Sequence, residues 1–348
     1  SLSPRTVSKG QTRSFEVALR NDAEAAVILD PAETIFTFTD GAHVFSAPLG
    51  VEDALSGNAT TTLRFAAATV PADMATGPRI AVVRLSGTEN GGLFDTTIAI
   101  TEPIDVVDPA SLAYQDGSFA PTIVSKRSAV SFSVGIENAG GADVVCDPDS
   151  TRLSFSDGSV DFVAALDADR GNVIGAGADT LWFDAVTIPD QIAVGSYAPS
   201  VRIVGGENGV PLAVDVPVGD DVTVQEPSRL AIGRIDILPG DRVTADQSMS
   251  WAARIHVQNN GGAPVRLDSL VLSLSVGVVD VTGEVALVSA DFTPGAETVG
   301  GGASDSFTVV FTDDPATAMT VGTVVVDAVV GGTDLNSGDP LIATTDSG

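Results

Sequence analysis

The sequence predicts an all-β protein made of three tandem immunoglobulin-like β-sandwich domains. Apolar and polar residues alternate over short segments, the same order of segments occurs three times, and Gly, Asn and Pro gather between the segments. Alternation with a period of two is typical of strands that bury one face. About seven such strands in each copy of about 100–120 residues describe an immunoglobulin-like sandwich.

The first segment of each copy is an alternating strand that ends at an asparagine. Phe15, Val17 and Leu19 precede Asn21 in the first copy, and the same pattern recurs at 132–138 and 253–259. Asparagine favours a turn because its side chain bonds to the nearby backbone. Glycines follow this asparagine in the second and third copies, so we expect a tight turn there.

Three further segments recur in the same order. Apolar residues take alternate positions in each, which predicts strands with one buried face. The last strand of each copy runs into a polar hairpin tip rich in Gly and Asn, residues that adopt a positive φ at low cost. The segments and tips are 36–41, 153–158 and 272–275; 63–71, 181–189 and 307–315; 77–85, 195–204 and 322–330; and 87–91, 206–209 and 332–338.

Prolines mark the joins between the copies. Asp108-Pro109-Ala110-Ser111-Leu112 matches Glu226-Pro227-Ser228-Arg229-Leu230. We therefore place domains at 1–108, 109–226 and 227–348. Because the linkers are short, we expect neighbouring domains to keep a limited range of orientations.

The two outer repeats differ from the middle one. Only six residues precede Val7, so the first strand of repeat 1 is expected to be short or missing, whereas repeat 3 lacks a counterpart of 222–227. Three explanations stay open: the chain is a segment of a longer array, subunits join head to tail with a strand that completes a neighbour's sheet, or terminal repeats have diverged.

This order of segments resembles CARDB and related bacterial immunoglobulin-like repeats, which are cell-adhesion-related domains. The first copy departs from the pattern, because Asn21-Asp22-Ala23-Glu24 lacks the glycines. The resemblance implies a surface or secreted location and a role in spacing, adhesion or assembly. The residues that carry it are Asn138, Gly140, Leu181, Phe183, Gly195, Tyr197, Asn259, Gly261 and Gly322.

Charge and composition exclude several classes of partner. The formal net charge is −29 and the isoelectric point is about 4.1, which argues against binding to nucleic acid or anionic membranes. No run of about 18 apolar residues occurs, so the sequence predicts no transmembrane helix. Cys146 is the single cysteine, so an intrachain disulfide is impossible.

Catalytic motifs are lacking, and we expect no enzyme activity. The two histidines, His43 and His256, fall in different repeats, and no hydrolase, phosphate-binding or zinc motif is present. Calcium is the one cofactor that the acid-rich joins suggest, since it prefers carboxylate and amide oxygens. The candidate ligands are Asp105, Asp108, Asp220, Asp221, Glu226, Asp334, Asn336 and Asp339.

Three functions stay open, the last of them an accessory region of a secreted enzyme whose catalytic domain lies outside this chain. The first is a non-catalytic extracellular structural protein of a bacterial or archaeal cell surface, a subunit or segment of a filament, stalk or surface layer whose partners are copies of itself. The alternative is an adhesin or carbohydrate-binding module of a larger secreted protein, with Trp182 and Trp251 as candidate sugar platforms. Aromatic residues make up only 5% of the chain, which favours the first function.

Overall fold

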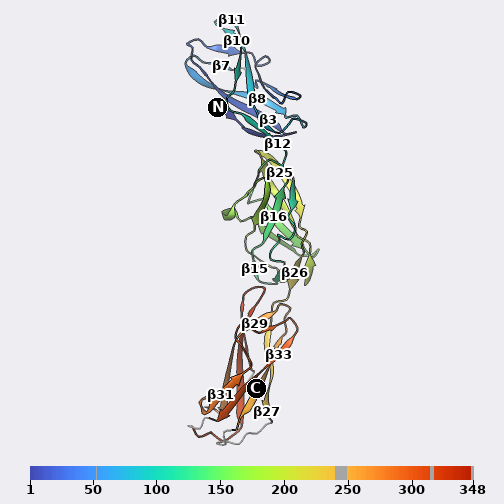
Figure 1. Ribbon diagram of the computed structural model, residues 1–348, viewed down its shortest axis with the longest axis vertical. Coiled ribbons are helices and arrows are strands. Elements are labelled where there is room, and N and C mark those ends of the chain that lie inside the picture. The colour runs from blue at the N-terminus through green and yellow to red at the C-terminus, as the bar shows by residue number, and fades with distance from the viewer. Residues whose placement is uncertain (52, 240–248, 314–316, 346–348) are drawn as a thin grey trace.

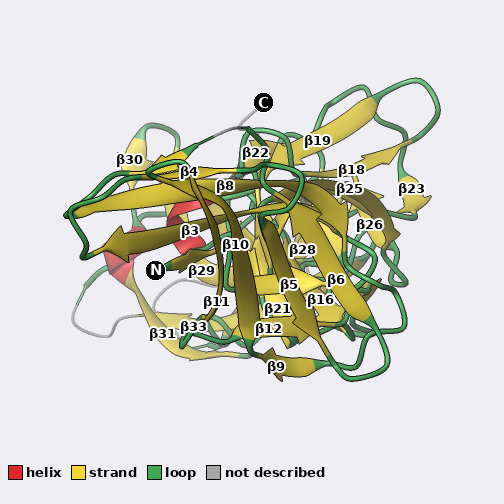
Figure 2. Cartoon of the chain, turned by 90° about the horizontal axis from the view of Figure 1, so that it is seen from above, coloured by secondary structure: helices red, strands yellow, loops and turns green. Residues whose placement is uncertain are grey.

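The computed structural model describes residues 1–51, 53–239, 249–313 and 317–345. Three β-sandwiches follow one another along an extended rod, with repeat 1 at the upper end of Figure 1 and repeat 3 at the lower end. Seen from above, the strands of the three sandwiches project over one another, as expected for stacking along one axis (Figure 2). Among the described residues, no helix is long and apolar enough to cross a membrane.

Repeat 1 forms two main sheets and a small third one at its lower end. The sheets have the orders β1-β3-β8, β6-β5-β10-β4-β7 with β11 beside β10, and β2-β12-β9. All pairs are antiparallel except β2 with β12. The strands are β1 (Leu2–Ser3), β2 (Thr6–Ser8), β3 (Thr12–Asn21), β4 (Val27–Leu29), β5 (Ile35–Thr39), β6 (Val44–Pro48), β7 (Ala54–Leu55), β8 (Ala59–Thr69), β9 (Gly77–Arg79), β10 (Ala81–Glu89), β11 (Gly92–Ala99) and β12 (Ile104–Val107).

Repeat 2 repeats this arrangement. Its sheets have the orders β13-β16-β21, β19-β18-β24-β17-β20 with β25 beside β24, β14-β26-β23 and β15-β22. The elements are β13 (Leu112–Tyr114), β14 (Ile123–Ser125), β15 (Ala129–Val130), β16 (Ser133–Asn138), β17 (Val144–Cys146), β18 (Arg152–Ser156), β19 (Asp161–Ala165), the 3-10 helix η1 (Ala168–Arg170), β20 (Val173–Ile174), β21 (Gly177–Trp182), β22 (Val186–Thr187), β23 (Gly195–Tyr197), β24 (Ser200–Glu207), β25 (Val210–Pro217) and β26 (Val222–Gln225).

Repeat 3 is a variant of the same sandwich with two sheets, β27-β28-β33-β31 and β30-β29-β34-β35 with β32 beside β29. The elements are β27 (Leu230–Leu238), β28 (Trp251–Asn259), β29 (Val265–Val276), β30 (Val279–Asp280), the 3-10 helix η2 (Thr282–Glu284), β31 (Val285–Ala290), β32 (Thr298–Val299), β33 (Ser304–Asp313), β34 (Val324–Asp334) and β35 (Pro340–Thr344).

The alternating residues fill the cores as the pattern predicts. In β3, Phe15, Val17 and Leu19 are buried while their neighbours face outward. Phenylalanine rings pack against one another in repeat 1, for example Phe38 on Phe45 with ring centroids 4.7 Å apart. The described core residues form three clusters, which run from Leu2 to Val106, from Phe119 to Val224 and from Leu230 to Ala343. Each repeat therefore buries its own core.

Repeat 3 differs from the other repeats in the strands that follow β29. Strands β6 and β19 return through tight turns and pair with β5 and β18. In repeat 3 the returning strand β30 pairs with β29 but has only two residues, and the chain continues through η2 into β31, which pairs with β33 in the other sheet. The third copy therefore differs from the uniform repeat that the sequence predicts.

Candidate functional site: the domain junctions

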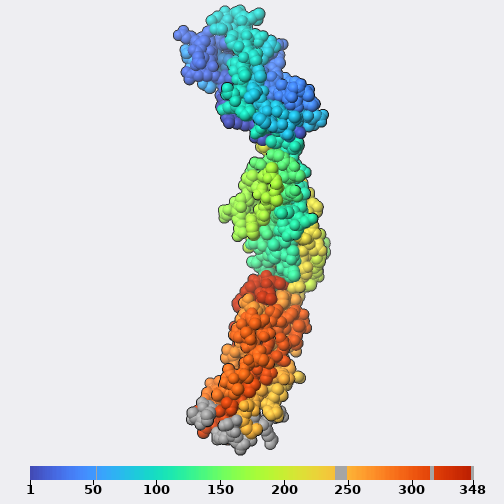
Figure 3. Space-filling model, viewed as in Figure 1, coloured from blue at the N-terminus to red at the C-terminus, as the bar shows by residue number. Residues whose placement is uncertain are grey.

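The two junctions between sandwiches are built from the same parts. We call the end of a repeat that faces downward in Figure 1 its lower end. The hairpin turn that points up from each repeat is its tip, which comprises 89–93 in repeat 1, 207–211 in repeat 2 and 334–338 in repeat 3. Figure 3 shows the red tip of repeat 3 against the green surface of repeat 2.

The tip of repeat 2 encloses a serine of repeat 1. The Ser8 hydroxyl donates to Glu207 Oε1 and accepts from Asn208 Nδ2 at 2.9 Å, while Gln11 Nε2 donates to the backbone oxygen of Glu207 at 2.9 Å. Ser8 is only 1% exposed. A buried hydroxyl without a hydrogen-bond partner is unfavourable, and the tip of repeat 2 supplies the partners of the Ser8 hydroxyl.

The tip of repeat 3 makes the matching contact with repeat 2. Asn336 Nδ2 donates to Ser125 Oγ at 3.2 Å and to Gln225 Oε1 at 2.9 Å. Ser125 is fully buried and occupies the same place in its Val-Ser-Lys triplet as Ser8 does in repeat 1. A tip asparagine that donates to the serine of the preceding repeat is thus common to both junctions.

Asn138 fixes the linker that enters repeat 2. Its Oδ1 accepts from the backbone amides of Ser111 and Gly140, each at 3.0 Å, and its Nδ2 donates to the backbone oxygen of Ala142 at 2.8 Å. The linker passes so close to Gly140 that a Cβ there would lie 1.9 Å from the oxygen of Pro109. The glycine is therefore required by close approach of the linker, in addition to the turn.

Asn259 repeats this arrangement at the second linker. Its Oδ1 accepts from the amides of Arg229 and Gly261, and its Nδ2 donates to the backbone oxygen of Ala263 at 2.7 Å. A Cβ on Gly261 would lie 2.0 Å from the oxygen of Pro227. The sequence pattern predicts both asparagines as turn residues, but it does not predict that they bind the linkers.

Both lysines of the chain lie at the junctions. Lys9 Nζ is 2.8 Å from Asp108 Oδ1, and Lys126 Nζ is 2.7 Å from Glu226 Oε1. The acid in each pair is the first residue of a linker. The lysine side chains are largely covered and the acids are exposed. Ion pairs near the surface contribute about 1 kcal/mol or less, so the buried hydrogen bonds dominate the junction. The chain has only these two lysines, so their positions in the sequence could have indicated where the junctions lie.

Asp334 stabilises the tip of repeat 3 from inside. Its Oδ2 accepts from the amide and the hydroxyl of Ser228, each at 2.7 Å, and its Oδ1 accepts from the amides of Asn336 and Ser337. Burial raises the pKa of this carboxyl group, but the Ser228 hydroxyl and the backbone amides outweigh it, so the pKa lies below its usual value. Both oxygens are thus used within the protein.

The other candidate calcium ligands are spread over several sites. Asp108 and Glu226 form the ion pairs described above, and Asp220 and Asp221 accept from Tyr114 and Ser196. The side chains of Asp105 and Asp339 are exposed. Among the described residues, no three His, Cys, Asp or Glu side chains gather closely enough to hold a metal ion. The calcium site stays a prediction.

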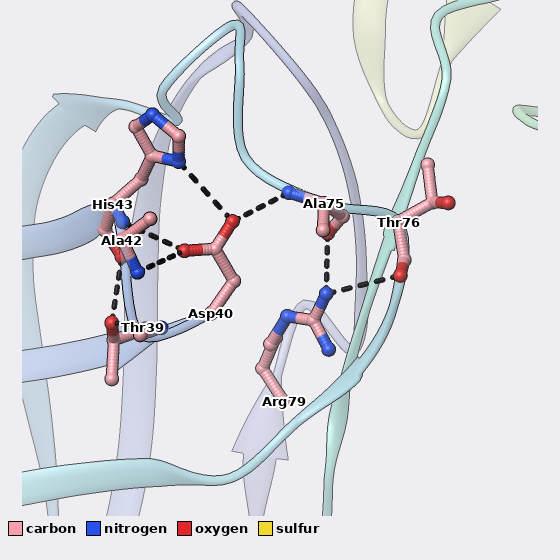
Figure 4. A network of polar contacts seen from close by, with 8 residues as sticks. Thr39, Asp40, Ala42, His43, Ala75, Thr76 and Arg79 are labelled. Carbon is pink, nitrogen blue, oxygen red and sulfur yellow. Dashed lines mark hydrogen bonds and ion pairs between the residues drawn. The ribbon is translucent and has the colours of Figure 1, made fainter.

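A buried carboxylate secures the loops at the lower end of repeat 1. Asp40 accepts from the amides of Ala42, His43 and Ala75, and Arg79 donates to the oxygens of Ala75 and Thr76 (Figure 4). The hydrogen bond from the backbone amide of Ala75 is the main reason why the pKa of Asp40 falls far below its usual range.

Repeat 2 has a counterpart of this network. Asp157 accepts from the amides of Ser159, Val160 and Ala193, and the bond from Ala193 is the main cause of its lowered pKa. The Tyr197 hydroxyl takes the place of the arginine and donates to the oxygen of Ala193 at 2.6 Å. The lower ends of both repeats are therefore held by charged hydrogen bonds.

The remaining chemically distinctive side chains have structural partners. Trp251 is only 5% exposed, which corrects its assignment as a sugar platform, and the exposed Trp182 carries the Arg170 guanidinium 4.7 Å from its ring centroid. His43 lies in the turn before β6, beside Asp40. His256 is half-buried, 2.8 Å from Asp236 Oδ2.

Cys146 ends β17 as a small buried side chain. Burial raises the pKa of its thiol to about 11. Since the thiolate is the nucleophilic form, this cysteine is an inert core residue.

No family model and no curated protein matches the sequence, so the resemblance to CARDB repeats is not confirmed. Solved structures align over most of the chain at low similarity. A marsupial T cell receptor is 11% identical and covers 98% of both chains with a TM-score of 0.30, and titin domains I67–I69 are 8% identical over 97% of this chain and 93% of theirs, with a TM-score of 0.24. A putative membrane anchored protein from Corynebacterium diphtheriae is 11% identical over 98% and 89%, with a TM-score of 0.22. The immunoglobulin-like fold accordingly rests on the strand topology of the chain itself.

Proposed function

We propose that the chain is a non-catalytic extracellular structural protein, a stiff spacer that serves as a subunit or segment of a filament, stalk or surface layer. The observation that carries this proposal is the repeated construction of the junctions. In both, a tip asparagine donates to a buried serine of the preceding repeat. In both, an asparagine of the following repeat binds the linker.

The linkers have little freedom to act as hinges. In the first, the oxygen of Asp108 accepts from the amide of Gly141 at 3.1 Å, its carboxylate pairs with Lys9, and Ser111 is bound to Asn138. Bending at the junction would break several of these bonds and expose the Ser8 hydroxyl. Each bond contributes about 1 kcal/mol, so their joint loss makes large bends rare.

The charge of the chain supports an extended surface role. A net charge of −29 spread along a rod opposes lateral clustering and keeps a large surface hydrated. The junction bonds between repeats use mainly hydroxyl and amide groups, which do not repel one another in so acidic a chain.

The alternative is an adhesin or carbohydrate-binding module. Trp182 is the one tryptophan on the surface, and its exposed fraction is 37%. Arg170 lies over its ring, where a stacked sugar would have to bind. Binding of glycans to immobilised protein, lost on Trp182→Ala, would favour this alternative over the spacer.

Negative-stain electron microscopy of single particles tests the spacer directly. We expect straight rods of three beads with a narrow distribution of angles between beads. The double variant Asn208→Ala/Asn336→Ala should broaden that distribution, because it removes the tip donors at both junctions. Asn172→Ala is the matched control, since Asn172 donates to Cys146 inside repeat 2. Freely bent particles of the unmodified protein would contradict the proposal.

A further inference from the structure

One long side of the repeat 3 sandwich is more open than the same side of repeats 1 and 2. In those repeats, β6 covers β5 and β19 covers β18 along five residue pairs each. In repeat 3, β30 covers only Ser275 and Val276 of β29, and β32 covers only Val265 and Arg266. The stretch 268–273 between them pairs with no strand on this side among the described residues, and we call it the open edge.

Two leucines of the open edge direct unpaired backbone groups outward. The amide of Leu274 donates to Thr282 Oγ1 at 2.9 Å, and its oxygen accepts from the amide of Val281 at 2.9 Å. Alternate residues of a strand direct their backbone groups to the same side, so Leu270 and Leu272 point theirs to this side too. Within the described part of the chain, no hydrogen bond reaches those groups from this side. Such an edge is a template for a further strand.

An apolar groove lies beside the open edge. It has a volume of about 270 Å³ and runs between Leu270 and Leu272 of one sheet and Leu287, Val309 and Phe311 of the other. Leu287 of β31 is 64% exposed. The walls of the groove and both ends of the open edge are formed by described residues in the middle of repeat 3, away from the ends of the rod. Exposed apolar surface next to an unpaired strand marks an interaction site.

Repeats 1 and 2 show what fills this place. Phe45 of β6 is 1% exposed and stacks on Phe38 of β5 with ring centroids 4.7 Å apart. Phe162 of β19 stacks on Phe155 of β18 at 4.6 Å. In both covering strands the next inward residue is an alanine, as in Ala47 of β6. Both residues of β30 are exposed, and neither lines the groove of repeat 3.

The surroundings of the groove are acidic. Asp268 and Asp280 lie at the two ends of the open edge, and Glu284 and Asp291 flank β31. Arg266 is the only lysine or arginine in the sequence after position 254, and it pairs with Asp268. A strand with basic residues at its ends is therefore attracted to this edge, whereas a second copy of a chain with a net charge of −29 is repelled.

The open edge also selects its occupant by length. At the upper end, the amide of Leu267 donates to the oxygen of Glu297, and its oxygen accepts from the amide of Gly295. At the lower end, the bonds of Leu274 close the edge. About five residues fit between these bonds, which is the length of β6 and of β19. Strand β29 of a second copy, with 12 residues, is too long for this space.

We propose that the open edge and its groove bind an extended segment of a partner protein. The segment pairs antiparallel with β29, as β6 pairs with β5. One aromatic side chain of the segment enters the groove between Leu272 and Leu287, and the next inward residue is small. Basic residues at its two ends face Asp268 and Asp280. The site lies on one rod, so this binding is independent of the role of the chain as a spacer.

Fluorescence anisotropy with a synthetic peptide tests the site on the full chain. The labelled peptide carries the sequence of β6, Val44–Pro48, between two pairs of lysines. We expect one peptide to bind per chain, and we expect Leu287→Asp to weaken binding by about tenfold or more, because it puts a charge in the apolar groove. Ile342→Asp is the matched control, since Ile342 is 74% exposed on β35 at the opposite edge of the sheet and the change adds the same charge.

Two methylated peptides separate strand pairing from simple apolar contact. In repeat 1 the amide of Leu49 donates to the oxygen of Thr34, so the alternate residues Phe45 and Ala47 direct their backbone groups toward β5. N-methylation of the peptide at these two positions should abolish binding, whereas N-methylation at the two positions that precede them should leave it. Hydrogen exchange should in turn show that the peptide protects the amides of Leu270 and Leu272.

Each other outcome overturns the inference. If the peptide does not bind, if Leu287→Asp binds it as well as Ile342→Asp does, or if both methylated peptides bind equally, the groove is not a site for strand addition. Sedimentation velocity of the unmodified chain tests the remaining occupant. Self-association that Leu287→Asp abolishes would identify a second copy in the groove, and the partner segment would be wrong. None of these results bears on the spacer, which the angles between beads test separately.

Discussion

Replacing Asn138 by alanine should destabilise repeat 2 more than any ordinary turn substitution. The side chain is 2% exposed, accepts from the amides of Ser111 and Gly140, and donates to the oxygen of Ala142. Alanine removes the partner of three backbone groups, of which the Gly140 amide and the Ala142 oxygen belong to buried residues. At about 1 kcal/mol or more for each group, the expected loss is about 3–4 kcal/mol in the free energy of unfolding.

Differential scanning calorimetry measures this loss, and the fluorescence of Trp182 follows the same repeat. For a domain of this size, about 3 kcal/mol lowers the melting temperature by about 10 °C. Asn21→Ala in repeat 1 is the comparison: Asn21 accepts from the amide of Ala23 and donates to the oxygens of Ala25 and Leu55, but the residue is half-buried, so water can replace part of what is lost. A loss below about 1 kcal/mol for Asn138→Ala would refute the role assigned to the linker bonds.

Three further predictions concern the same regions. Gly140→Ala should destabilise the first junction by about 1–3 kcal/mol in chemical denaturation, because its Cβ would meet the oxygen of Pro109, whereas Gly206→Ala has ordinary van der Waals space and should cost less. Asp40 and Asp157 have pKa values below the ordinary 3.8, so each adds to the free energy of unfolding above about pH 4, and this addition is lost as the pH falls. Between pH 5 and pH 2 the melting temperature of Asp40→Asn should therefore change less than that of the unmodified protein. Melting with calcium and with a chelator tests the predicted calcium site: a bound ion would raise the melting temperature and the chelator would reverse the rise, whereas an unchanged melting temperature would dismiss the site.

The strands were predictable because their pattern is local. Phe15, Val17 and Leu19 alternate with polar residues, and only a strand places all three on one buried face. Recurrence of this pattern with the same turn residues then predicts three similar sandwiches. The pairing of β31 with β33 was not predictable, because the sequence of Val285–Ala290 does not specify its partner strand.

The junctions were harder to predict because their partners are far apart in the sequence. Ser8 meets Asn208 across 200 positions, and neither residue differs in type from those of an ordinary turn. Asn138 was identified as a turn residue, but its bond to Ser111 depends on the strand register that brings the linker beside it. Local pattern predicts the elements, whereas contacts between repeats depend on register and tip geometry.

The chemistry of the junctions suits a chain with so large a negative charge. Salt screens the Lys9–Asp108 and Lys126–Glu226 ion pairs at the junctions, but such pairs contribute little. Asn208 and Asn336 donate to buried serines, and these neutral bonds change little with ionic strength. The acids on the outer surface do respond to salt, because their mutual repulsion is screened. The straightness of one rod and the spacing between neighbouring rods are therefore governed by different groups, so salt can change the packing of rods while each rod keeps its shape.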